Sequence, residues 1–420
     1  MTIRSLLLII RRSLKQHALS TCVTIFSGAL ASGLVIAVFS IQAQTRQAFT
    51  GGPAGFDAVL GARGSQLQLV LNTVFHLETS PGNIPWSMYQ TIKKNPAVAL
   101  AIPYAVGDNY MGFRIVGTTQ ELFTQFEYQA GRHFEARPGG RFFNPLAREA
   151  VVGSFVAQRT GLKVGSIFNP YHGIIFDKKK KHDEQYVVAG VLKPTNTPSD
   201  RVVWIPIEGF YRMSGHVLRG TGKEYVAKPG EGIPDEHKEV SAVMLKLNSP
   251  EDGFMLDQTI NKQGKVATLA WPIGRSMAEF FDKIGWINTV LALVAYLVVV
   301  VVASSIFTST YNSINERKRD FAILRALGAH RRIVFTAVVL EATVISALGA
   351  LAGYLVYAAI LSVTALIIRA QTGVALEIFW FHPALIFGPL GIILLGAVAG
   401  ILPAFKAYRT DVATNLTPIS

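Results

Sequence analysis

The sequence lacks most of the residue patterns on which enzymes depend. It holds a single cysteine, Cys22, so neither an internal disulfide nor a cysteine-based zinc cluster can form within the chain. A G-x-S-x-G nucleophile elbow, an H-E-x-x-H zinc motif and a G-x-x-x-x-G-K-[ST] phosphate-binding loop are all missing. The nearest approach to that loop, GTGKE at 220–224, has no Ser or Thr after its lysine. We therefore predict that the chain has no catalytic residues, binds no metal and carries no cofactor of its own.

Charge is also missing from four long stretches of the chain. Each exceeds the roughly 20 residues that an α-helix needs to cross a bilayer, and the third contains one charged residue, Glu341. The first is longer than the apolar part of a signal peptide and has no clear cleavage site after it, so we expect an uncleaved anchor with Cys22 buried in it. The predicted spans are 20–43, 285–308, 337–360 and 382–403.

Basic residues outnumber acidic ones, 40 to 27, and their positions predict the orientation of the spans. If the chain crosses the membrane four times, twelve Lys and Arg residues flank one side, whereas the other has mainly Arg46, Lys283 and Arg369. The positive-inside rule places the richer side, with both termini, in the cytoplasm. Lipid headgroups then account for the excess charge, and nucleic acid is not an expected partner. The twelve are Arg4, Arg11, Arg12, Lys15, Arg317, Lys318, Arg319, Arg325, Arg331, Arg332, Lys406 and Arg409.

The predicted fold class is an α-helical membrane protein with four transmembrane helices and a large α+β extracytoplasmic domain, in two lobes, between helices 1 and 2. The domains are 1–45, 46–283 and 284–420, and the second is large enough for its own core. The apolar face at 60–75 favours packing within that domain over contact with a substrate near the membrane. Other predicted elements are a strand, a helix ending near Gly161 and a strand over 149–168, strands at 186–192, 201–207 and 241–247, and a helix at 85–96.

A run of four lysines at 178–181 has potential metal ligands on both sides. Their spacing fits no standard metal site, and the lysines would repel a cation. A solvated hairpin tip is therefore the favoured interpretation. The potential ligands are His172, His182, Asp183 and Glu184.

Small residues four apart recur in the first, third and fourth spans, where they let helix backbones approach closely. We expect either tight packing within the bundle or dimerisation. Glu341 is a functional candidate, because ionisable residues within spans are costly. It lies near the cytoplasmic end of its span, however, so pairing with Arg331 or Arg332 is the favoured interpretation. The packing glycines are Gly28, Gly33, Gly349, Gly353, Gly396 and Gly400.

The charged segment 315–328 lies between the second and third spans and predicts a short amphipathic helix. Its apolar side chains fall within one arc of a helical wheel, and Gly328 is well placed to end it. Such a helix could lie on the anionic membrane surface or insert into a groove on a cytoplasmic partner. The apolar arc is formed by Phe321, Ile323, Leu324 and Leu327.

The stretch ERKRDFAILRALGAHRRIVFTAVVLEA (316–342) closely resembles the motif after the second span of MacB/FtsX-like ABC-transporter permeases. The order of one span, a large outer domain and three further spans is also similar, and 401–411 resembles the family's exit from the last span. The match is sharp in the last third and loose over 46–283. The matching positions are Glu316, Arg317, Arg319, Asp320, Ile323, Leu324, Arg325, Leu327, Gly328, Ala329 and Glu341, with Pro403, Ala404 and Ala407 near the end.

The resemblance implies a permease of a bacterial inner membrane whose 315–328 helix docks into a separate ABC ATPase that binds the ATP. It also implies a second permease copy and mechanical export or release of a lipoprotein, peptide or lipid-linked substrate. One alternative is a regulator that signals ATPase state to an extracytoplasmic partner such as a cell-wall hydrolase. Another is an anchored sensor without an ATPase. The ATPase-coupling residues are then Glu316, Arg317, Arg319, Asp320, Phe321, Leu324, Arg325, Leu327 and Gly328.

Overall fold

The computed structural model describes residues 3–51, 55–213, 225, 232–377 and 380–408. The GTGKE stretch lies outside these residues. The chain divides into two compact units. We call them the membrane unit, which comprises Met1–Thr45, Ile284–Ala365 and Glu377–Ser420, and the α/β unit, which comprises Arg46–Lys283 and Leu366–Leu376.

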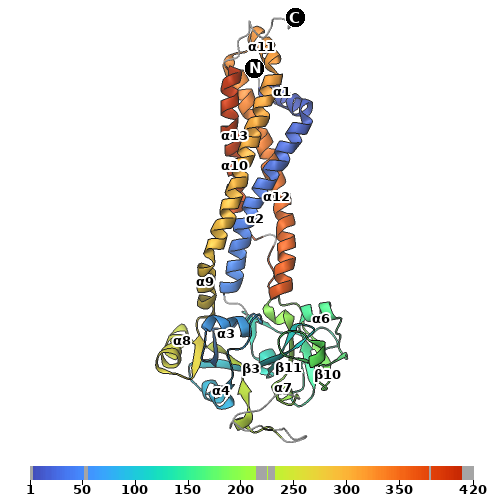
Figure 1. Ribbon diagram of the computed structural model, residues 1–420, viewed down its shortest axis with the longest axis vertical. Helices are drawn as coiled ribbons and strands as arrows, with labels where there is room; N and C mark the ends of the chain where they lie inside the picture. Colours follow the sequence, from blue (N-terminus) through green and yellow to red (C-terminus); the bar gives the residue numbers. More distant parts are fainter. Residues whose placement is uncertain (1–2, 52–54, 214–224, 226–231, 378–379, 409–420) are drawn as a thin grey trace. The chain divides into compact units, whose positions relative to one another are not determined.

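The membrane unit is helical throughout its described elements. Four of its helices are long and apolar enough to cross a membrane, as predicted, and they run lengthwise beside one another (Figure 1). Cys22, expected to be buried, is instead exposed on the first of them. A further helix precedes the first span. The helices are α1 (Ile3–Gln16), α2 (Ala18–Thr50), α10 (Gly285–Glu316), α11 (Lys318–Ala326), α12 (Arg331–Thr372) and α13 (Ala384–Tyr408).

Glycines let α2, α12 and α13 pack backbone to backbone. A Cβ added to Gly28 would lie 3.4 Å from Cα of Gly349, and one added to Gly353 would lie 2.6 Å from Cβ of Ser32. At the α12–α13 contact, a Cβ on Gly400 would lie 2.8 Å from the Cβ of Ala342. The six glycines singled out in the sequence thus lie at two helix contacts inside one chain, where small residues allow close approach.

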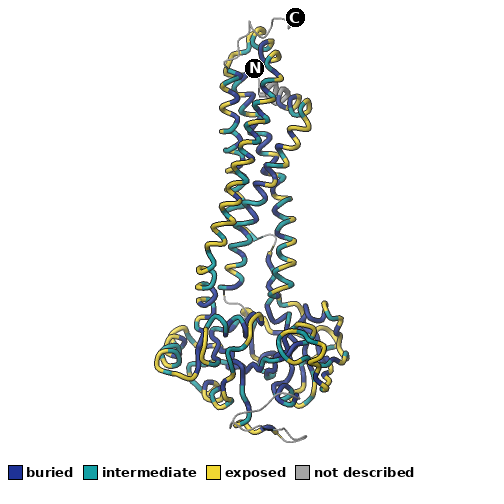
Figure 2. Tube along the Cα trace, in the orientation of Figure 1, coloured by how far each residue is buried: buried dark blue, intermediate teal, exposed yellow. Residues whose placement is uncertain are grey.

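The outer faces of these helices are apolar and exposed. Only 17–44% of the most apolar window of each span is buried within the chain, and Figure 2 shows buried and exposed residues alternating along each helix. In water such surfaces would be unfavourable, but lipid tails solvate them without cost. The exposed faces therefore agree with the four spans.

The α/β unit is built on one large mixed sheet of ten strands among the described residues. Its order is β14-β1-β13-β3-β4-β11-β7-β10-β8, and β9 pairs with β3. One long strand joins the two halves of this sheet, because the first half of β3 pairs with β13 and the second half with β4. The strands are β1 (Ala58–Ala62), β3 (Val98–Tyr110), β4 (Phe113–Thr118), β7 (Glu149–Val152), β8 (Ile167–Phe168), β9 (Tyr171–His172), β10 (Tyr186–Val191), β11 (Val202–Pro206), β13 (Ala242–Leu247) and β14 (Ala267–Ala270).

Both faces of the sheet are buried. Successive residues of β11 alternate between two apolar clusters, with Val203 and Ile205 in one and Val202 and Trp204 in the other, as the two-residue period of a strand requires. Helices and small hairpins cover the faces. They are α3 (Gln66–Thr73), α4 (Trp86–Lys93), α5 (Glu121–Thr124), α6 (Ser154–Thr160), α7 (Ile207–Tyr211), α8 (Pro250–Asp257) and α9 (Ile273–Lys283), with strand pairs β2 (Ile84–Pro85) and β12 (Glu239–Val240), and β5 (Glu127–Gln129) and β6 (Arg132–His133).

Several local predictions for this unit are confirmed. Residues 149–168 form β7, α6 and β8, and Gly161 ends α6 in the left-handed conformation with φ 76°. The apolar face at 60–75 is packed, since Leu69 and Val70 of α3 are fully buried. The last turn of α12 also belongs to this unit, where the guanidinium of Arg201 donates to the carbonyl of Gln371.

The glycine contacts predict a difference between two Gly→Ala substitutions. Gly353→Ala forces a Cβ against the Ser32 side chain and the Gly33 amide nitrogen of α2, whereas a Cβ at Gly391 of α13 meets no atom within 4 Å. We expect Gly353→Ala to destabilise the chain by about 1–3 kcal/mol through overpacking. Gly391→Ala should have no effect or a small stabilising one, because Ala is the better helix former. Thermal unfolding in detergent measures both, and equal melting temperatures would contradict the packing argument.

Candidate functional site

The strongest candidate site is the end of the membrane unit where α10, α11 and α12 meet. Helix α10 ends at Glu316, and the amide of Arg317 still donates to the carbonyls of Ser313 and Ile314 at 3.1 and 3.2 Å. Helix α11 then covers Lys318–Ala326. The helical prediction for 315–328 is therefore met by two helices joined at Arg317.

Gly328 ends α11, in the role that the sequence analysis gives it. Its φ is 96°, a conformation that favours glycine. The amide of Gly328 donates to the carbonyl of Arg325, and that of Ala329 to the carbonyl of Leu324, both at 3.0 Å. This is the Schellman pattern, which satisfies the last carbonyls of a helix and reverses the chain sharply. The chain can therefore begin α12 at Arg331.

A buried ion pair joins the segments that meet here. The guanidinium of Arg317 donates to Glu341 Oε2 at 3.0 Å and to Ser13 Oγ at 2.6 Å. The Ser13 hydroxyl donates in turn to Glu341 Oε1. The side chains of Arg317 and Glu341 are only 10% and 13% exposed. One closed network thus connects α1, the α10–α11 junction and α12.

The predicted partners of Glu341 are wrong. Arg331 lies ten residues earlier on the same helix, about 15 Å along its axis, and both Arg331 and Arg332 are exposed. The true partner, Arg317, comes from the preceding helix. The sequence analysis does not identify Ser13 as a partner of this pair. The helix that carries Ser13 could have been predicted, because the spacing of Leu6, Leu7, Ile10 and Leu14 among basic residues is typical of an amphipathic helix.

The predicted apolar arc of α11 is covered by neighbouring helices at one edge and exposed at the other. Phe321 is 2% exposed and packs with α10, α12 and α13 in a cluster that Leu324 also joins. The Arg317 guanidinium lies 5.0 Å from the centre of the Phe321 ring. Ile323 and Leu327 lie on the other side of the helix and are 43% and 80% exposed. Phe321 thus holds α11 to the bundle, and the Ile323 side is open.

The open face combines apolar and charged groups, all within the coupling segment named from the sequence. Ile323, Ala326 and Leu327 are exposed, and Arg319 and Asp320 beside them are exposed as well. Glu316 is exposed too and forms a 3.1 Å contact with His17 Nδ1. The predicted coupling residues therefore divide into a buried group, Arg317 and Phe321, a partly buried group, Leu324 and Arg325, and an exposed group, Glu316, Arg319, Asp320, Leu327 and Gly328.

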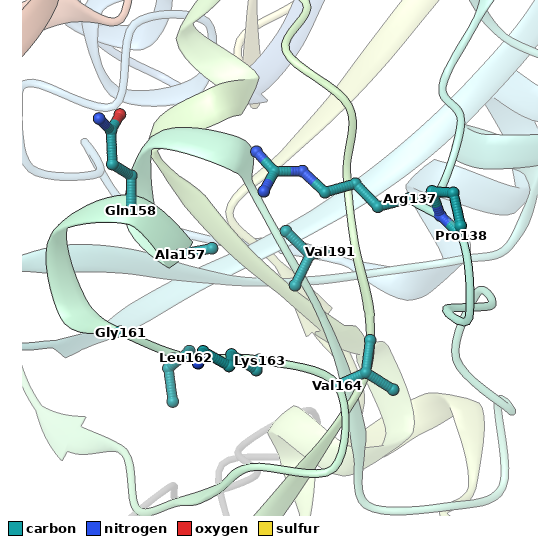
Figure 3. A pocket seen from close by; sticks show the side chains of 9 residues that line it. All are labelled: Arg137, Pro138, Ala157, Gln158, Gly161, Leu162, Lys163, Val164 and Val191. Atoms are coloured by element: carbon teal, nitrogen blue, oxygen red, sulfur yellow. The ribbon is translucent and has the colours of Figure 1, made fainter.

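The α/β unit contains a separate hollow of about 680 Å³ beside α6. Figure 3 shows the side chains around it, which come from α6, the loop after it, β10 and residues 137–138. Ala157, Leu162 and Val191 give it apolar walls, and Arg137 and Lys163 add positive charge. It has no titratable pair suited to acid–base chemistry among its lining residues, so the α11 end remains the stronger candidate site.

Comparison with known proteins places the last third of the chain in a family. Residues 292–412 match the model of the FtsX-like permease C-terminal family. The uncharacterized ABC transporter permease MJ1507 of Methanocaldococcus jannaschii is 25% identical over 237 residues, which are 56% of this chain and 55% of that protein. The macrolide export ATP-binding/permease protein MacB of Bordetella avium is 23% identical over 239 residues, 54% of this chain and 33% of MacB.

Among solved structures, the periplasmic region of MacB from Actinobacillus actinomycetemcomitans aligns with 57% of this chain and 98% of that region, at 11% identity and a TM-score of 0.33. The matched segment spans about half the length of the archaeal relative and a third of the Bordetella protein.

The fold is that of a membrane protein with four spans and a large α/β domain between the first and the second. Residues 292–412 are thus similar to the C-terminal domain of FtsX-like permeases, and over about half of its length the chain is similar to ABC transporter permeases that include MacB.

The Arg317–Glu341 pair predicts a non-additive pair of substitutions. Arg317→Met or Glu341→Met alone leaves a buried charge without its partner and should destabilise the membrane unit by about 3–5 kcal/mol. The double substitution leaves neither charge and should lose much less than the sum. Denaturation in detergent measures the four states of this cycle.

The exposed pair Arg275 and Glu279, 73% and 59% exposed, provides the control. The same Met substitutions there should have little effect, singly or together, since water screens exposed pairs. Additive losses at Arg317 and Glu341 would show that the two side chains are not energetically coupled.

Proposed function

We propose that this permease couples ATP binding and hydrolysis by a separate ABC ATPase to movement of the α/β unit. The observation that carries the proposal is the two-faced helix α11. Its inner face is fixed by Phe321 and the Arg317–Glu341–Ser13 network. Its outer face presents Ile323 and Leu327 beside Arg319 and Asp320, which suits insertion into a groove on a partner.

The same contacts supply a route for mechanical force. A push on α11 reaches α10 through the short Arg317 junction, α12 through Glu341 and α1 through Ser13. Helix α12 extends over 42 residues, about 63 Å. It begins next to α11, and its last turn belongs to the α/β unit through the Arg201–Gln371 contact. Displacement of α11 would therefore be carried to the α/β unit by stiff helices.

ATP itself would be bound by the partner, because the sequence has no phosphate-binding loop. In our proposal two permease copies sit on an ATPase dimer in a cytoplasmic membrane, with both termini of the chain in the cytoplasm and the α/β unit outside. The family resemblance suggests a lipoprotein, a peptide or a lipid-linked molecule as cargo, which the moving outer units would export or release. A further extracytoplasmic partner would fit the same arrangement.

Substitutions on the open face of α11 test the docking step. Ile323→Asp with Leu327→Asp should abolish co-purification of an ABC ATPase in mild detergent, because acidic groups cannot enter an apolar groove without a large desolvation cost. The wild-type chain should retain a protein with a phosphate-binding loop, identified by mass spectrometry, together with ATPase activity. Both side chains are exposed, so the fold should survive.

Leu146→Asp is the matched control, because Leu146 is 92% exposed in the α/β unit. It should leave ATPase capture unchanged. Phe321 is unsuitable for this test, since its burial would confound lost docking with lost packing. If the wild-type chain captures no ATPase, the proposed coupling to ATP hydrolysis is wrong.

Cysteine labelling tests the proposed orientation. In a Cys22→Ser background, Lys179→Cys in the α/β unit should react with a membrane-impermeant maleimide in cells or spheroplasts with an intact inner membrane. Arg332→Cys, just after the α11 segment, should react only after the inner membrane is opened. Both native side chains are exposed, so accessibility within the fold is not limiting. The reverse pattern would invert the topology that the basic residues predict.

A further inference from the structure

Three side chains of the α/β unit converge in a way that their sequence positions do not suggest. Asp108 Oδ1 lies 3.4 Å from His172 Nδ1 and 3.4 Å from His182 Nε2. All three of these atoms lie within 4.8 Å of one another. The sequence analysis assigned both histidines to a solvated hairpin tip. The structure corrects this for His182, which is 5% exposed, and adds Asp108, which is fully buried.

Strand pairing explains the convergence. Strand β9 pairs with β3 so that His172 lies directly opposite Asp108. The pairing of β3 with β4 shifts register between Val106 and Asp108, a β-bulge of the kind that re-aims a side chain. His182 follows the turn Lys178–Lys180, and its amide donates to the carbonyl of Pro170 just before β9. Backbone contacts thus bring both histidines to the same carboxylate.

Two asparagine side chains hold the segments that carry the histidines. The Asn109 amide donates to the carbonyls of Tyr171 and Gly173, at 3.3 and 2.8 Å, on either side of His172. The Asn169 amide lies within 3.0–3.3 Å of the carbonyls of residues 182, 183 and 184. The backbone at each histidine is therefore fixed by a neighbouring polar side chain, as in sites with defined geometry.

We propose that Asp108, His172 and His182 bind a divalent transition-metal ion, with Zn²⁺ as the best match. A tetrahedral zinc ion bound at about 2.0–2.1 Å holds its ligand atoms about 3.3 Å apart. The two carboxylate–imidazole distances of 3.4 Å are close to that value. His172 is half-exposed, so its ring can turn to complete the geometry. Imidazole ligands favour zinc and its neighbours over magnesium or calcium.

Glu184 lies near His182, at a distance longer than a hydrogen bond. His182 directs Nε2 at Asp108, and its other ring nitrogen, Nδ1, lies 4.0 Å from Glu184 Oε2. A carboxylate at the far nitrogen of a metal-binding histidine fixes its tautomer and makes it a stronger ligand. Three protein ligands leave one tetrahedral position for water or for a group from a partner, as in open zinc sites.

The nearby lysines do not exclude a cation. Lys178, Lys179, Lys180 and Lys181 are all exposed, so solvent and salt weaken their repulsion of a cation. Asp108 and Glu184 together carry two negative charges, which balance a divalent ion when the imidazoles are neutral. Metal binding is independent of the proposed ATPase coupling, so either can fail alone.

The test uses the full chain in detergent with a tag that contains no histidine. After treatment with a chelator, the protein is titrated with Zn²⁺ in competition with a chromophoric chelator. Co²⁺ is added separately as a spectroscopic probe. We expect one tight Zn²⁺ per chain, visible absorption bands of tetrahedral Co²⁺, and a rise in melting temperature with Zn²⁺, since a ligand of the folded state stabilises it.

His172→Ala and Asp108→Asn should each weaken Zn²⁺ binding at least tenfold and abolish the Zn²⁺-dependent rise in melting temperature. His133→Ala is the matched control: His133 is 47% exposed against 49% for His172, and it lies 3.6 Å from Glu127. It should bind Zn²⁺ like wild type. If all three variants bind Zn²⁺ like wild type, or if wild type binds none, the cluster is an imidazole–carboxylate pair and the metal proposal is overturned. If Asp108→Asn fails to fold, His172→Ala still tests the proposal, because His172 is half-exposed and its substitution should not prevent folding.

Discussion

The buried Arg317–Glu341 pair constrains the whole α11 end of the membrane unit. Taking both ions out of water costs several kcal/mol each, and their attraction at 3.0 Å offsets this only while the geometry holds. If α11 moved away alone, two charges would be left unpaired in an apolar cluster. Ser13 binds both members of the pair, so α1 is subject to the same constraint. The segments therefore move together or not at all, which is the property that a coupling device needs.

The open face of α11 also limits how docking can work. Ile323 and Leu327 are 43% and 80% exposed, so burying the rest of both contributes about 2–4 kcal/mol, whereas association of two proteins costs about 4–15 kcal/mol in lost freedom. One α11 helix alone would therefore bind weakly. Charged contacts from Arg319 and Asp320 add specificity more than affinity. The two permease copies and two ATPase subunits that we propose would engage at once and raise the effective affinity without new contacts.

The sequence predicts local features well and long-range ones poorly. Charge-free runs predict the four spans, and the φ of Gly328 follows from its position after a helix. The wheel of α11 places Phe321 and Ile323 at the two edges of one arc about 160° wide, but it does not show which part of that arc the neighbouring helices cover. The site around Asp108 could not be found from spacing, because a strand register and a bulge, formed with distant residues, bring it to His172.

The helix contacts favour a mechanical device over a conduit. At the α2–α12 contact the backbones of Gly28 and Gly349 approach so closely that an added Cβ would lie 3.4 Å from a Cα. At the α12–α13 contact, Gly396 leaves no room for a Cβ beside Ser346. A polar solute could pass between these helices only if the backbones separated, which would break the close packing that holds helices together in lipid. Helices that stay packed can still tilt as one body. In the coupling that we propose, work done at α11 would then be transmitted along these packed helices.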